Sequence, residues 1–168
     1  MRHRALIVLS LFVYSVAGGQ DVSRAKSDCE TLMNAVLPLA EQLLQEYGEF
    51  FPYGGALKAD GQLASVSGYD GREQPPSDDI VRLVKQGFVE GAKSGEYVAT
   101  ALVYDVRVTL PSNGQKSDAI AVSLNHRDNY SVVVLFPYQL VDGELQYGEA
   151  IAQEGEREEH FHCNQPHA

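Results

Sequence analysis

Residues 97–138 read YVATALVYDVRVTLPSNGQKSDAIAVSLNHRDNYSVVVLFPY, and this stretch decides the fold. Two turn signals, Pro111-Ser112-Asn113-Gly114 and Asp128-Asn129, divide it into three runs rich in Val, Ile, Leu and Tyr. Runs of β-branched and aromatic residues separated by such turns are typical of strands joined by hairpins. The stretch therefore predicts a meander of three antiparallel strands.

A helix is predicted over residues 28–47, before the meander. It follows the capping box Ser27-x-x-Glu30, and its apolar residues recur at steps of three and four. Pro38 lies inside this pattern and removes one helical hydrogen bond, so we expect a kink or a break near residues 34–38.

A hairpin and a second helix follow the first helix. Asp60-Gly61 is a strong hairpin signal between two short apolar runs. The second helix is predicted to start at Ser77, whose side chain we expect to cap it, and to end near Lys93. Residues 144–152 allow a further strand or a short helix, and we favour the strand.

The order helix-strand-strand-helix-strand-strand-strand predicts an α+β domain. We expect an antiparallel sheet of five to six strands with the helices packed on one side of it. Over residues 28–138 this order resembles the roadblock and profilin-like domains, whose members bind partners or small ligands. The segments EFFPYGGALKADGQL and SDAIAVSLNHRDNYSVVVLFPY also resemble a small bacterial family of unknown function that includes immunity-type proteins.

The first 20 residues, MRHRALIVLSLFVYSVAGGQ, have the pattern of a secretory signal peptide. Arg2 and Arg4 precede an apolar core too short to span a bilayer, and Ser15-Val16-Ala17 is a small-x-small cleavage site. We therefore expect a protein exported to the periplasm or the medium, with no membrane contact after cleavage. The predicted organisation is a signal peptide (1–20), a mobile lead-in (21–27), one domain (28–152) and a charged tail (153–168).

Two cysteines, Cys29 and Cys163, suit an exported chain, because such compartments are oxidising. We predict a Cys29–Cys163 disulfide that ties the C-terminal tail to the domain. The alternative is a metal site in the tail formed by His160, His162 and His167 with Cys163. Its spacing matches no zinc motif, and we predict no cofactor.

Two groups of polar residues are candidates for a function. Asp105 and Arg107 alternate with apolar residues on one strand, and Ser123 and Asn125 alternate on the next, so we predict that these four form an exposed binding surface. His126 lies at a strand end, where it is a weak candidate for a general base. No other catalytic motif is visible, and the HRD triplet at residues 126–128 lacks the companion motifs of a kinase.

Composition limits the kind of partner. The net charge of −10 argues against nucleic acid, whose phosphates require a basic surface. It permits a basic partner, and the alternative is that the acidity simply keeps a small protein soluble. The function that the sequence favours is therefore an exported, acidic, single-domain protein of inhibitor or immunity type that acts by binding another protein. The alternatives are a small hydrolase-type enzyme that uses His126, and a ligand or metal carrier that uses the tail. Nothing in the sequence indicates the oligomeric state.

Overall fold

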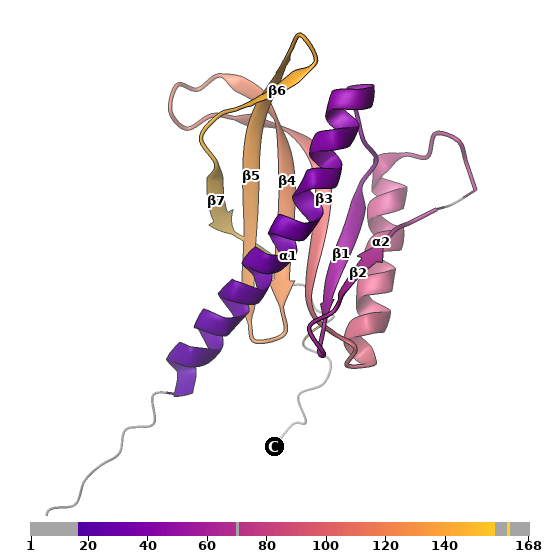
Figure 1. The fold of residues 1–168 in the computed structure, drawn as a ribbon, viewed down its shortest axis with the longest axis vertical. Helices are drawn as coiled ribbons and strands as arrows, with labels where there is room; N and C mark the ends of the chain where they lie inside the picture. Colours follow the sequence, from indigo (N-terminus) through magenta and orange to yellow (C-terminus); the bar gives the residue numbers. More distant parts are fainter. Residues whose placement is uncertain (1–16, 70, 157–160, 162–168) are drawn as a thin grey trace, which may run out of the picture.

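The protein is a three-layer α+β domain in which one antiparallel sheet lies between two helices (Figure 1). The computed structural model describes residues 17–69, 71–156 and 161. The helices are α1 (Ala17–Tyr47) and α2 (Ser77–Lys93), and the strands are β1 (Tyr53–Lys58), β2 (Leu63–Val66), β3 (Tyr97–Thr109), β4 (Lys116–His126), β5 (Tyr130–Val141), β6 (Glu144–Tyr147) and β7 (Ile151–Glu154). The predicted α+β class is confirmed.

The sheet has the strand order β2-β1-β3-β4-β5-β6, and β7 also pairs with β5. The predicted meander is β3-β4-β5, with Leu102 opposite Ser123 and Val122 opposite Val134. The strand favoured over residues 144–152 is present, but it is split into β6 and β7. Gly148 bridges the split by donating a main-chain hydrogen bond to Pro137. Residues 153 and 154, assigned to the tail from the sequence, complete β7.

The two helices lie on opposite faces of the sheet, so the expectation that both lie on one side is wrong. Helix α1 covers the larger core, and its buried residues pack against alternate residues of the central strands: Ala101, Val103, Ile120, Val122 and Leu124. Helix α2 packs Ile80, Val84 and Phe88 against Leu102 on the other face. The β3 segment from Val98 to Val103 is buried on both faces because each face carries a helix.

Helix α1 begins at Ala17, well before the predicted start at Asp28, and includes residues 21–27. The capping-box residues lie within the helix, where the Thr31 hydroxyl donates to the Ser27 carbonyl. Pairs four residues apart, such as Lys26–Glu30 at 3.7 Å, support this extension. The helix also continues through Pro38, so the predicted break is absent, and the alternative of a kink stays a prediction. Figure 1 shows the first turns of α1 projecting beyond the sheet.

Candidate functional site

Both helices pack closely over two adjacent glycines of β1. A Cβ atom on Gly54 would lie 2.6 Å from Cζ of Phe88 in α2, and one on Gly55 would lie 2.5 Å from Cγ1 of Val36 in α1. Neither position therefore has room for a side chain. Both positions are glycine because each face of β1 carries a different helix at close range.

An apolar groove lies beside this contact, between α1 and the β1–β2 hairpin. Its volume is about 240 Å³, and its lining includes Gly54 and Gly55 of β1. Helix α1 passes over β1 without covering β2, so the side chains at the groove's edges remain accessible. Leu39 is 46% exposed on the α1 side, and Leu63 is 50% exposed on the β2 side.

A second hollow of about 520 Å³ continues from this groove toward the C-terminal end of α1. Leu39, Tyr53 and Ser67 line both hollows. The second hollow adds large apolar groups from α1 and the segment after it, namely Leu43, Tyr47, Phe50 and Phe51. Tyr47 is 71% exposed and Phe51 is 47% exposed.

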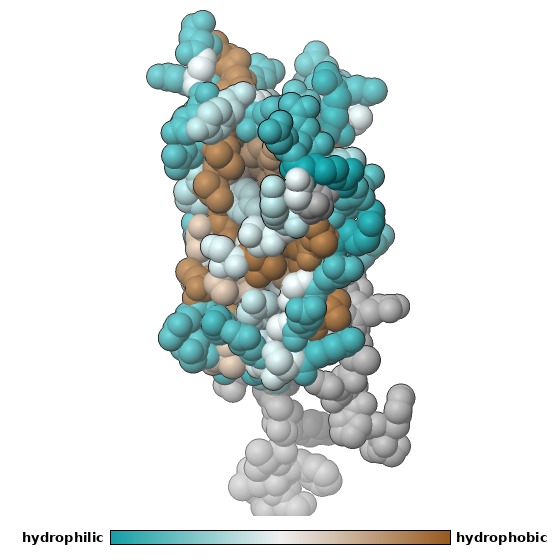
Figure 2. Space-filling view, turned by 90° about the vertical axis from the view of Figure 1, so that its right-hand side faces the viewer, coloured by the Kyte–Doolittle hydropathy of each residue, from teal (hydrophilic) through white to brown (hydrophobic). Residues whose placement is uncertain are grey.

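We call the combined region the α1–β2 surface and define it by Leu39, Leu43, Tyr47, Phe51 and Leu63. Figure 2 shows hydrophobic residues gathered in a band down the side of the molecule that carries β2 and α2, between hydrophilic areas. Among the described residues, four of the nine exposed large hydrophobic side chains belong to this surface. Contiguous exposed apolar area of this kind marks an interaction site more often than scattered residues do.

Strand β2 gives the same surface an open main-chain edge. It is the terminal strand of the sheet on this side. The main-chain N–H of Lys58 donates to the carbonyl of Gln62, so these two residues form a hydrogen-bonded pair. In the same register, Ala56 is opposite Ala64 and Gly55 is opposite Ser65. Hydrogen-bonded and non-bonded pairs alternate along antiparallel strands. The main-chain groups of Ala64 therefore point toward β1, and those of Leu63 and Ser65 point outward.

The four residues predicted as a binding surface do not lie together. Asp105 and Arg107 lie on the α1 face, where Asp105 is opposite Ile120 and Arg107 is opposite Asp118. Ser123 and Asn125 lie on the α2 face, opposite Leu102 and Thr100. Asn125 is also only 5% exposed. The prediction that these residues share one face is therefore wrong.

The pair Asp105 and Arg107 and the pair Ser123 and Asn125 lie in different environments. Asp105 accepts a hydrogen bond of 3.2 Å from the Tyr138 hydroxyl, and Arg107 lies 3.4 Å from Asp118. Ser123 lies in a hollow of about 540 Å³ between α2 and β7, whose lining includes Tyr104, Lys85 and Glu154. This hollow is bounded by charged side chains and offers less continuous apolar area than the α1–β2 surface.

His126 is buried under α1 rather than placed at an exposed rim. Its side chain is 1% exposed, its Nδ1 accepts the main-chain N–H of Asp128 at 3.0 Å, and its Nε2 lies 3.3 Å from Oδ2 of Asp28. The acceptor role of Nδ1 places the proton on Nε2, which donates to Asp28. Burial lowers the pKa of His126, although Asp128 and Asp28 oppose this shift. The predicted general base therefore has no exposed nitrogen through which to act.

Cys29 is a residue of α1 that is buried in the core, and it carries a free thiol in this structure. Burial, with the nearby charges of Asp28 and Glu30, raises its pKa to about 12. Its predicted partner, Cys163, lies outside the described residues, as do His160, His162 and His167. The disulfide and the alternative metal site in the tail therefore stay predictions.

Within residues 17–69, 71–156 and 161, no three His, Cys, Asp or Glu side chains are grouped so as to hold a metal ion. None of the helices in this part of the chain has the length and apolar character to span a membrane. Comparison with known proteins found no matching family model, no matching curated protein and no matching solved structure.

Proposed function

We propose that this chain is an exported, acidic protein that acts by binding another protein through the α1–β2 surface. The observation that carries the proposal is the continuity of this surface: two apolar hollows share Leu39, Tyr53 and Ser67, and the first of them lies beside an open strand edge. Export is supported by the leader-like first 20 residues.

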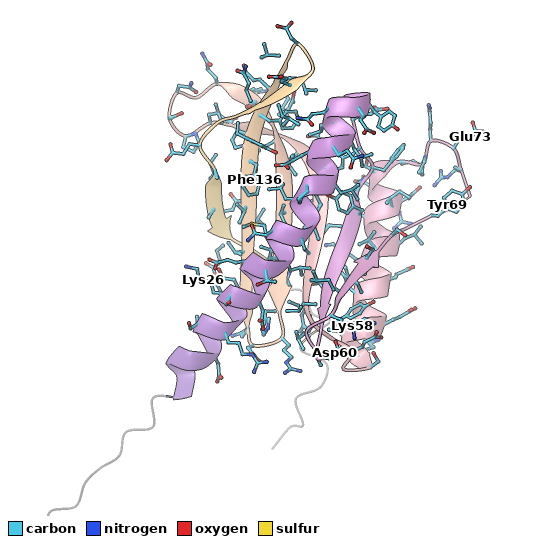
Figure 3. The ribbon with its side chains drawn as sticks, viewed as in Figure 1. Lys26, Lys58, Asp60, Tyr69, Glu73 and Phe136 are labelled. Atoms are coloured by element: carbon cyan, nitrogen blue, oxygen red, sulfur yellow. The ribbon has the colours of Figure 1, made fainter. Side chains whose placement is uncertain are left out.

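The charge around this surface supports a basic partner. Glu49 lines the second hollow, and Asp60 lies in the turn that leads into β2, while Glu73 lies at the outer tip of the loop between β2 and α2 (Figure 3). The nearest cation on the hairpin, Lys58, is held by Glu96 at 2.8 Å. A basic partner would therefore be attracted to the rim while its apolar groups fill the hollows. An inhibitor or immunity role is the form of binding that these features suit best.

The experiment is recovery of a partner from the exported fraction with three forms of the protein. Wild type should retain one protein in stoichiometric amount, and Phe51→Glu should lose it, because a charge in the apolar hollow is costly. Val141→Glu is the matched control, since Val141 is 40% exposed on β5, away from the α1–β2 surface. Equal recovery by wild type and Phe51→Glu, or no recovered protein at all, would contradict the proposal.

A further inference from the structure

The two edges of the sheet differ in how they are protected. The edge formed by β6 and β7 is interrupted at residues 148–150 and carries Glu144 and Glu154. Breaks and charges of this kind prevent another strand from adding to an edge. Strand β2, with the sequence LASV, has no charged residue, no proline and no interruption. Within the described sheet, only the β2 edge lacks charges and a break, and this short edge lies beside an apolar groove.

We infer that the partner binds as an extended segment that adds to the sheet as a strand alongside β2. This inference rests on the proposed function and specifies how the partner is held. The outward main-chain groups of Leu63 and Ser65 would pair with the main chain of the segment. Side chains of the segment that point toward α1 would enter the groove between Leu39 and Leu63.

The side chains of β2 fit this arrangement. Ser65 is opposite Gly55, whose missing side chain faces Val36 of α1, so Leu63 and Ser65 lie on the α1 face. Val66 packs with the α2 cluster on the other face. Alternate side chains of an added strand point to opposite faces. Every second residue of the segment would therefore enter the groove, and branched apolar residues suit its lining.

Net charge favours a segment of another protein, rather than a second copy of this chain, as the strand that pairs with β2. Pairing of β2 with β2 of another copy would bring together two molecules that each carry a net charge of −10. Asp60, in the turn that leads into β2, adds to this repulsion when two copies pair (Figure 3). A segment with alternate apolar residues and a basic residue at the end next to Asp60 meets attraction there instead.

The test is selection of binders from a random peptide library displayed against the full purified protein. The selected peptides should show apolar residues at every second position with Lys or Arg near one end. Their affinity should fall about tenfold on Ser65→Pro, which removes an outward N–H, and should be unchanged on Val141→Glu, a change on β5 away from the α1–β2 surface. Methylation of alternate peptide nitrogens should weaken binding to the wild type similarly, which gives the same answer if Ser65→Pro fails to fold.

The outcomes separate this inference from the proposed function. Peptides that lose affinity on Leu39→Glu but tolerate both Ser65→Pro and nitrogen methylation would overturn strand addition while leaving the α1–β2 surface as a binding site. Peptides with apolar residues at steps of three and four would do the same, since they indicate a bound helix. Peptides indifferent to Leu39→Glu would contradict both. A selection without binders overturns strand addition, and partner recovery then decides the proposed function alone.

Discussion

The hydroxyl of Tyr53 donates a 2.7 Å hydrogen bond to the carbonyl of Val36, and it accepts a 3.0 Å hydrogen bond from the N–H of Ala40. A regular helix joins these two main-chain groups to each other. Pro38 lies between them and provides no N–H. The phenol from β1 is therefore inserted where the proline loosens α1, and it fixes the helix beside the groove.

Tyr53→Phe should destabilise the fold. The change leaves the ring in place but removes the group that satisfies Val36 and Ala40, so we expect a loss of about 1–2 kcal/mol in the free energy of unfolding. Urea denaturation followed by circular dichroism measures this. Tyr47→Phe, at a 71% exposed side chain, is the control and should be neutral. Equal stability of the two variants would show that the inserted hydroxyl contributes nothing.

Gly55→Ala should be destabilising because its Cβ would lie 2.5 Å from Cγ1 of Val36. Overpacking of this kind costs roughly 1–3 kcal/mol, and thermal or urea unfolding would report it. The double variant Gly55→Ala with Val36→Ala should recover part of the loss, since the shorter side chain leaves space. A neutral Gly55→Ala variant would mean that α1 does not pack on β1 as described.

His126 should make stability depend on pH between neutral and mildly acidic conditions. Its pKa in the folded state lies below the ordinary 6.5, so the unfolded chain binds a proton first. The contribution of neutral His126 to the free energy of unfolding is therefore fully present above pH 6.5. It is lost as the pH falls toward the folded-state pKa.

The variant His126→Asn keeps an acceptor for the Asp128 N–H but cannot titrate. Its free energy of unfolding, measured across the same pH series, should vary less than that of the wild type. His126 is the one histidine in the described part of the chain, so a difference between the two curves can be assigned to it. Parallel curves would mean that His126 keeps its ordinary pKa.

The predicted Cys29–Cys163 disulfide can be tested on the exported protein by its intact mass without a reducing agent. The bridged chain is lighter by two hydrogens than the reduced chain, and loses this difference on reduction. Without the bridge, the buried Cys29 thiol should resist alkylation in the native protein, because its pKa is about 12. Detection of two free thiols in the exported protein would contradict the disulfide.

Local signals in the sequence were sufficient for the elements of the fold. The turns that divide the meander adopt the expected conformations, since Gly114 has a φ of 71° and Asn129 has a φ of 64°. Helix α2 spans Ser77–Lys93 as predicted, although Pro76 occupies the N-cap position and no side chain caps it. Turn chemistry and apolar periodicity act within a few residues, so one sequence carries them fully.

Relationships across the sheet were harder to predict. The four polar residues were assigned to one face by assuming a register through the turn at residues 111–115, and a shift of one residue moves a whole strand to the other face. The opposite placement of the helices had a signal, because residues 98–103 are apolar on both sides of β3 apart from Thr100. The sequence carries no signal for the α1–β2 surface, because an apolar residue such as Phe51 is predicted to be buried.

Hydrogen exchange of the protein with its recovered partner tests the central claim most directly. Binding through the α1–β2 surface predicts slower amide exchange at Leu63 and Ser65, together with protection around Phe51. The exchange of Ala64 should change less, because its N–H already bonds to β1. Protection confined to the hollow between α2 and β7, with β2 unchanged, would contradict the account.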